Sequence, residues 1–269
     1  MVKNEGDNLK KVVVCSPKSE YFKVKDLTTH NFITYPEPNQ AKREHDRLRS
    51  ILKGFGSEVI DIPELPGHPN SVFTRDTSIC TPEGYVKLRM GLESRRGEGE
   101  WMSEILDSLG EQRAGIIKEP ATIEGGDIIL GGEVAFISLS SRTNEEGAGK
   151  VTELLMGMNY EVRTINLPKP FLHIGGAMSI IGRGCVLCCA GVFPEEYFEG
   201  FEVIKISSDK FITGNVITLG DGEVIVEVKN FLVIKKLKER GFKVHTIELS
   251  EFIKGGGGPS CLTLPIERE

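Results

Sequence analysis

The stretch VITLGDGEVIVEVKNFLVIKKLKERGFKVHTIEL (216–249) decides the fold. It begins with two β-branched runs on either side of Gly-Asp-Gly, a pattern typical of a pair of strands joined by a tight turn. An amphipathic helical segment follows and ends at Gly241, where a helix C-terminus favours a left-handed residue. Val244, Thr246 and Leu249 then alternate along a further strand. The stretch therefore predicts a unit of strand, strand, helix and strand.

The same unit recurs along the chain. Strand pairs begin near residues 72, 124, 173 and 215, at intervals of 52, 49 and 42 residues. The phrase of helix, glycine and strand recurs at 51–63, 154–168 and 237–249, with a looser copy at 105–120. A fifth unit is split: SCLTLPI begins a strand near 261, and the N-terminus adds the strand KKVVVCSP, a helix over 40–54 and a strand over 57–62.

Five units closed by joining the termini predict an α/β ring of blades in a single domain over residues 1–269. A closed ring leaves few exposed sheet edges. The alternative is an ordinary open α/β sheet with accidental periodicity. In a pseudo-symmetric ring, the starts of the equivalent first strands meet at one axis, so polar motifs far apart in the sequence are expected to meet there.

Composition narrows the possible partners and compartment. The chain is 39% hydrophobic and 27% charged, which is a globular balance. Its 33 Lys and Arg against 39 Asp and Glu give a net charge of −6, which argues against nucleic acid or an anionic membrane as main partner. No apolar run is long enough for a membrane span, and the N-terminus has no signal core. We expect a soluble, cytoplasmic protein whose six cysteines stay reduced.

Two residues could form a thiol–imidazole pair. Cys261 follows four glycines and a proline in KGGGGPSCLTLP (254–265), where the backbone can bend closely around a ligand. A thiolate there would be a strong nucleophile, although a buried strand cysteine explains the motif equally well. His173 lies in PFLHIGGAMS (170–179), and a lone His in that setting is more often a hydrogen-bonded core residue. GCVLCC (184–189) reads as a buried strand rather than a metal site.

Acidic side chains open two further units. Glu124 and Asp127 bracket Gly-Gly in ATIEGGDIIL, and either could orient the histidine or hold a cation, or belong to a solvated turn. Asn70 and Asp76 lie in PNSVFTRDTSI, with Arg75 between them, as candidate ligands for a charged small molecule.

Two arginines lie in loops after strands. Arg95 is in LESRRGE (92–98) and Arg142 in LSSRTNEEGA (139–148). Arginine is suited to bidentate recognition of a carboxylate, although both segments could equally be solvent-facing starts of helices.

Together these motifs resemble the guanidino-group-modifying enzymes of the pentein fold: arginine deiminases, dimethylarginine dimethylaminohydrolases and amidinotransferases. FTRD (73–76), EGGD (124–127), the His173 segment and GGGGPSC ending at Cys261 occur in that family's order, over nearly the whole chain. The resemblance implies a pentein five-bladed α/β propeller of ββαβ units with pseudo-fivefold symmetry.

The resemblance also implies a mechanism, and this mechanism needs no metal or organic cofactor. Cys261 would attack the guanidinium carbon of a free arginine derivative and form a covalent S-alkylthiouronium. His173 would act as general acid and then as general base, oriented by Glu124. The products would be citrulline and an amine or ammonia.

The substrate contacts are implied in the same way. Asp76 would bind the guanidinium nitrogens, Arg95 and Arg142 would hold the substrate carboxylate, and Asn70 would be a neighbouring contact. Asp127, beside Glu124 in the motif, is interpreted first as turn structure.

The exact substrate stays open. Arginine deiminases show His-Leu-Asp where this chain has Gly175, and they carry an extra helical domain. Both differences favour the dimethylaminohydrolase branch, whereas the wording FTRDTS is closer to the deiminases. The alternatives are an amidinotransferase, which would use an amine acceptor in place of water, and a non-catalytic pentein that binds a partner. The sequence leaves the oligomeric state open, and a homodimer is one of the possible states.

Overall fold

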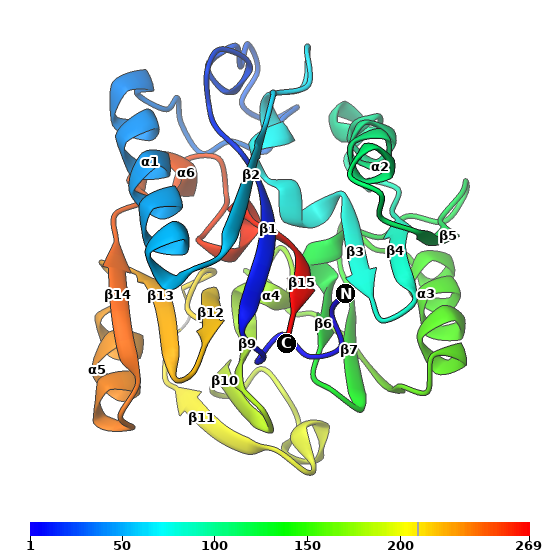
Figure 1. Cartoon of the computed structure of the whole chain (residues 1–269), viewed down its shortest axis with the longest axis vertical. Coiled ribbons are helices and arrows are strands. Elements are labelled where there is room, and N and C mark those ends of the chain that lie inside the picture. Colours follow the sequence, from blue (N-terminus) through cyan, green and yellow to red (C-terminus); the bar gives the residue numbers. More distant parts are fainter. Residues whose placement is uncertain (209) are drawn as a thin grey trace.

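The computed structural model describes residues 1–208 and 210–269, and it arranges five three-stranded sheets around one axis (Figure 1). The first four blades are β3 (Ser78–Thr81), β4 (Gly84–Lys87) and β5 (Arg113–Ile116); β6 (Ile128–Leu130), β7 (Val134–Leu139) and β8 (Glu161–Asn166); β9 (Met178–Gly182), β10 (Cys185–Cys189) and β11 (Glu202–Ile206); β12 (Val216–Gly220), β13 (Glu223–Glu227) and β14 (Lys243–Ile247). The predicted ring of blades is confirmed.

Both termini build the fifth blade. Its strands are β15 (Leu264–Arg268), β1 (Leu9–Cys15) and β2 (Glu58–Ile62), and the central strand β1 pairs with β15 antiparallel and with β2 parallel. Each other blade repeats this order, with the middle strand antiparallel to the first strand and parallel to the third. Joining the first and last residues of the chain in one sheet closes the ring, as the split repeat predicts.

Helices lie on the outside of the ring (Figure 1). They are α1 (Pro38–Phe55), α2 (Glu98–Ser108), α3 (Glu145–Gly157) and α5 (Phe231–Glu239), with the short helix α4 (Ile174–Ala177) near the axis and the short helix α6 (Ser250–Ile253) against α1. On α1 the side chains of Ala41, His45, Leu48 and Leu52 are buried, in steps of three and four residues. Burial of that one face fixes the helix against its blade.

One blade departs from the predicted unit. Between β10 and β11 the chain has a single 3-10 turn, Glu195–Phe198, in place of an α-helix. This connection spans only residues 190–201, with Pro194 inside it and glycines in the left-handed region at both ends. A helix of three turns does not fit in that length.

The core is made by the inner strands. Every residue of β3, β6 and β12 is buried, whereas the outer strands β5, β8 and β14 alternate between partly buried and exposed positions. Side chains near the axis are therefore shielded from water, which raises the energetic cost of any unpaired charge there.

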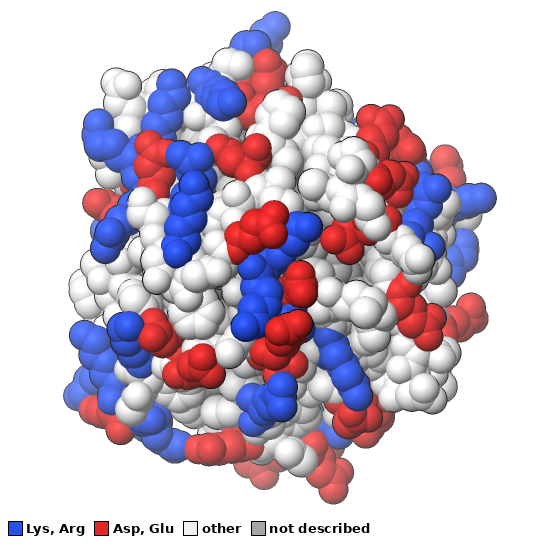
Figure 2. Space-filling model, viewed as in Figure 1, with Lys and Arg blue, Asp and Glu red and all other residues white. Residues whose placement is uncertain are grey.

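The face shown in Figure 2 carries Lys and Arg side chains interspersed with Asp and Glu. This face offers no extended surface of one sign, in keeping with the net charge. Among residues 1–208 and 210–269, no helix is long and apolar enough to cross a membrane.

Candidate active site

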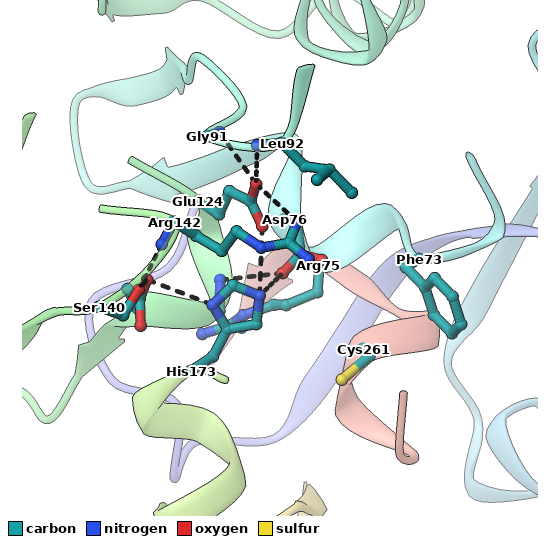
Figure 3. Close-up of polar contacts among 12 residues, drawn as sticks. Phe73, Arg75, Asp76, Gly91, Leu92, Glu124, Ser140, Arg142, His173 and Cys261 are labelled. Atoms are coloured by element: carbon teal, nitrogen blue, oxygen red, sulfur yellow. Dashed lines mark hydrogen bonds and ion pairs between the residues drawn. The ribbon is translucent and has the colours of Figure 1, made fainter. Parts of the chain in front are cut away.

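The predicted polar motifs meet near the ring axis. Short helical turns precede the first strands of four blades and carry the motif residues: Thr74–Asp76 before β3, Gly125–Asp127 before β6, α4 before β9 and Ser260–Leu262 before β15. Figure 3 shows the side chains of Asp76, Glu124 and His173 converging on one point, with Cys261 across from them. Residues up to 185 positions apart in the sequence thus share one site, because each opens the innermost strand of its blade.

His173 is surrounded by carboxylates. It is 7% exposed, and its Nε2 lies 3.2 Å from Glu124 Oε2 and 3.7 Å from Asp76 Oδ1, while its Nδ1 lies 3.2 Å from Asp127 Oδ2. Burial alone would lower the pKa of His173, but the charges of Asp127 and Asp76 and the contacts with Asp127 and Glu124 raise it well above its ordinary value. The surrounding carboxylates therefore favour the imidazolium form of His173.

Asp127 lies behind the histidine, away from the cavity. Its carboxylate accepts hydrogen bonds from Ser138 Oγ at 2.6 Å, Ser140 Oγ at 2.7 Å and Thr143 Oγ1 at 2.6 Å, and from the backbone N–H of Ile174 at 3.2 Å. It is fully buried. These contacts hold Asp127 in place beside Nδ1 of the His173 ring, in addition to the turn role expected from the sequence.

Glu124 connects the histidine to two arginines. Its Oε1 lies 3.5 Å from Arg142 Nη1 and accepts the backbone N–H groups of Gly91 and Leu92 (Figure 3). Its Oε2 lies 3.7 Å from Arg95 Nη1. Burial alone would raise the pKa of Glu124, but the contact with His173 and the two guanidinium charges lower it to about 2. Glu124 is therefore ionised at every physiological pH.

The depressed pKa of Glu124 predicts an acid-dependent stability. Its contribution is complete above the pKa of the unfolded chain, about 4.5, and is lost as the pH falls towards 2. We expect the free energy of unfolding of the wild type to fall by a few kcal/mol, roughly, over that interval, and that of Glu124→Gln to fall less. Urea unfolding at pH 6 and pH 3 measures both slopes, with Glu133→Gln on the surface as the matched control. An unchanged slope in Glu124→Gln would contradict this assignment.

Asp76 and Arg95 form a buried ion pair beside the cavity. Arg95 Nη1 donates to Asp76 Oδ2 at 2.6 Å, its Nε donates to Glu98 Oε2 at 2.9 Å and its Nη2 donates to the carbonyl of Phe73 at 3.1 Å. Burial raises the pKa of Glu98 to about 7, against the opposing charge of Arg95. The predicted role of Arg95 at a substrate carboxylate stays a prediction, since all these contacts are within the protein and support a role in fixing Asp76.

Asp76 keeps room for a second cation. Its Oδ1 accepts the backbone N–H of Gly126 at 3.2 Å, and a carboxylate has about four acceptor sites in all. A Cβ at Gly126 would lie 2.8 Å from both Asp76 Oδ1 and His173 Cγ. Only glycine therefore allows this approach of the carboxylate and the imidazole.

Arg142 and Asn70 line the same cavity. Besides its contact with Glu124, Arg142 is held by its backbone N–H, which donates to Ser140 Oγ at 3.0 Å. Asn70 donates from Nδ2 to the carbonyl of His30 at 3.0 Å, and its Oδ1 is buried without a partner among residues 1–208 and 210–269. A free acceptor and a guanidinium on one wall suit a zwitterionic ligand, so their predicted substrate contacts remain open to test.

Cys261 is half-buried and reaches the cavity from the fifth blade. Its Sγ accepts the side-chain N–H of Asn215 and the backbone N–H of Gly258, both at 3.4 Å. Burial and the charge of Asp76 raise the pKa of the Cys261 thiol, whereas the two hydrogen bonds and the charge of His173 act in the opposite direction. A cation entering beside the sulfur would favour the thiolate further.

The cavity has two parts on either side of Cys261 and His173. One is lined by Asn70, Asp76, Arg95 and Arg142, and the other by Gly175, Ser179, Asn215 and Val216. Both are bordered by Leu172 and Gly256. The first part is therefore bordered by Asp76, Arg95 and Arg142, and the second part also by Glu5 and Arg75, which pair with each other at 2.6 Å.

The same donors bear on metal binding. Asp76, Glu124 and His173 each offer a ligand atom, and these atoms lie within 4.8 Å of one another. However, Arg95 already pairs with both carboxylates, and the raised pKa of His173 opposes the neutral form that ligates a metal. The donor set fits charge balance by protein cations better than a metal centre.

The sequence motifs do not predict a place in the site for Asn215, Glu98 or the three hydroxyl groups around Asp127. Asn215 has a signal in the sequence, because it directly precedes β12, the one first strand whose opening was given no site residue. Glu98 and the hydroxyls carry no such signal, since they reach the site through packing between neighbouring segments.

The chain is similar to known proteins over most of its length. Residues 28–268 match the family described as N,N dimethylarginine dimethylhydrolase, eukaryotic. An uncharacterized protein of Aeropyrum pernix is 32% identical over 84% of each chain, and the N(G),N(G)-dimethylarginine dimethylaminohydrolase of Pseudomonas aeruginosa is 27% identical over 89% of this chain and 93% of its own.

Solved structures agree. A Cys-to-Ser mutant of the Pseudomonas aeruginosa dimethylaminohydrolase, complexed with citrulline, superposes with a TM-score of 0.85 at 25% identity, over 96% of this chain and 99% of that one. The N-terminal domain of a cyanobacterial arginine dihydrolase gives a TM-score of 0.85 at 20% identity, over 97% and 98% of the two chains, and shows the fold alone.

Proposed function

We propose that this chain, which belongs to the N,N-dimethylarginine dimethylhydrolase family, hydrolyses a free Nω-methylated arginine. Members of this family are hydrolases that act on C–N bonds of linear amidines. The products are citrulline and a methylamine. The observation that carries the proposal is the meeting of Cys261, His173 and the Asp76 carboxylate in one cavity.

The first half-reaction forms a bond to sulfur. The substrate guanidinium binds against Asp76, where a carboxylate and a guanidinium make paired hydrogen bonds. Its charge lies beside Cys261 and favours the thiolate, which attacks the central carbon. As the C–N bond breaks, the departing nitrogen takes the proton of His173 and leaves as the amine. The carbon is then held on Cys261 as a thiouronium.

The second half-reaction returns the enzyme to its starting state. Neutral His173, still oriented by Asp127 and Glu124, takes a proton from water as the oxygen attacks the same carbon. The C–S bond breaks, the electron pair returns to Cys261, and the ureido group of citrulline is released. The imidazolium is re-formed, the second proton of the water passes to solvent as the C=O of the urea forms, and the released amine takes up one proton from solvent, so that protons balance over the cycle.

Substrate selection is assigned to the two parts of the cavity. Arg142 and Asn70 lie in the first part, where the α-carboxylate and α-amine of an amino acid need partners. On the other side, a Cβ at Gly175 would touch only the carbonyl oxygen of Gly126, at 3.3 Å. No side chain occupies that position, which leaves room for methyl groups on the substrate nitrogen.

A product assay tests the proposal. Arginine, monomethylarginine, dimethylarginine and agmatine are offered in parallel, with and without an amine acceptor, and products are identified by mass spectrometry. We expect citrulline from the methylated arginines, less from arginine and no product from agmatine, which lacks the carboxylate. Turnover of arginine above both methylated forms would overturn the assignment of the substrate, and a new guanidino product with the acceptor would overturn hydrolysis.

A further inference from the structure

We infer that Asn215 is a catalytic residue of this site, which donates a hydrogen bond to the reacting sulfur of Cys261 and thereby favours its thiolate. The inference rests on the proposed function for the role of the thiolate, and on contacts that are independent of any substrate. Asn215 is 3% exposed and lies at the start of β12, across the ring axis from Asp76 and Glu124.

The geometry fixes which end of the amide faces the sulfur. Asn215 Oδ1 accepts the backbone N–H of Ser260 at 2.8 Å, which is a contact that an amide nitrogen cannot make. The Nδ2 donor is therefore turned to Cys261 Sγ, at 3.4 Å. One side chain both positions the turn that carries Cys261 and supplies a proton donor to it.

A second donor completes the arrangement. The backbone N–H of Gly258 reaches the same sulfur at 3.4 Å. A Cβ at Gly258 would lie 2.7 Å from the Asn215 amide, so the glycine is what allows the amide to sit there. Two N–H groups thus converge on the sulfur, and both favour its charged form, whereas burial and the charge of Asp76 oppose it.

Because hydrogen bonds to a charged form stabilise it, removing the amide donor will make the thiolate harder to form. Asn215→Asp separates the two functions of the residue: an aspartate still accepts the N–H of Ser260, but it offers no donor and places a negative charge beside the sulfur. Asn215→Ala removes both contacts and tests the donor if the aspartate variant does not fold.

The test is the pH dependence of Cys261 alkylation by iodoacetamide in the absence of substrate, followed peptide by peptide. We expect the midpoint to rise by about one pH unit in Asn215→Ala and by more in Asn215→Asp, with alkylation below the midpoint slowed about tenfold or more. The half-buried Cys185 in the same sample is the internal control, and Asn144→Asp is the matched variant away from the sulfur.

A wild-type midpoint in Asn215→Asp would show that the residue only positions the turn and would overturn the inference, and so would a lower midpoint in Asn215→Ala. The alkylation measurement needs no turnover, so failure of the product assay and failure of this inference are separate results. In the active enzyme, the rising limb of kcat/KM against pH is expected to shift by the same amount.

Discussion

Replacing Cys261 with serine is expected to lower turnover of dimethylarginine by at least about a thousandfold, because the covalent step depends on a thiolate in the cavity. A serine hydroxyl takes the place of the thiol but ionises far above the pH range of the enzyme. The two N–H donors from Asn215 and Gly258 cannot compensate for that difference. Steady-state release of citrulline measures the loss.

The same substitution separates the nucleophile from the scaffold. Cys185→Ser, in β10, changes a half-buried thiol outside the cavity and is expected to keep full turnover. Acid-quenched wild type should carry the amidino carbon on the peptide of Cys261 during turnover, whereas Cys261→Ser should carry none. Substantial activity in Cys261→Ser, or an adduct on another cysteine, would refute covalent catalysis by this residue.

Replacing Arg95 with alanine is expected to lower the free energy of unfolding by about 3–5 kcal/mol. Arg95 is 3% exposed and contacts Asp76, Glu98 and Glu124, so its removal leaves buried carboxylates without their cation. Arg95→Lys keeps the charge but not the planar set of donors, and should recover only part of the loss. Urea unfolding at neutral pH measures these differences, with the exposed neighbour Arg96→Ala as control.

Kinetics of the Arg95 variants decide between two roles. If Arg95 acts by fixing Asp76, we expect Arg95→Lys to lower kcat and to raise KM for dimethylarginine. If Arg95 holds the substrate carboxylate, as the family resemblance implies, KM rises while kcat stays at the wild-type value. A stable Arg95→Ala protein would show that the buried carboxylates can take up protons at little cost.

Much of the fold is readable from local patterns. The hairpin around 220–222, the left-handed glycine after α1, α2 and α5 and the spacing of about fifty residues describe interactions within one blade. After α3 the predicted Gly157 is still helical, and Asn159 takes the left-handed position instead. The exception, the 3-10 turn between β10 and β11, also has a local cause in the length of that connection. Closure of the ring follows from the split fifth unit, since a strand at each end of the chain needs a partner.

The site is readable only in part. Cys261, His173, Glu124 and Asp76 stand out because each precedes the first strand of a blade, and repetition predicts that such positions converge. Their partners do not stand out. Arg95 looks like a loop arginine until its guanidinium is seen enclosed by Asp76 and Glu98, and Asp127 looks like a turn residue until three hydroxyls and His173 surround it.

The sequence by itself determined the five-unit ring, the order of the motifs and the residue types that guanidino chemistry needs. The tertiary structure alone decided which charges are paired, which end of Asn215 faces the sulfur and which side of the cavity is open at Gly175. The physical reason is the separation along the chain over which each kind of interaction acts. Periodicity and turn chemistry act over a few residues, whereas ionisation and hydrogen bonding in a buried site depend on every group that packing brings within a few ångströms.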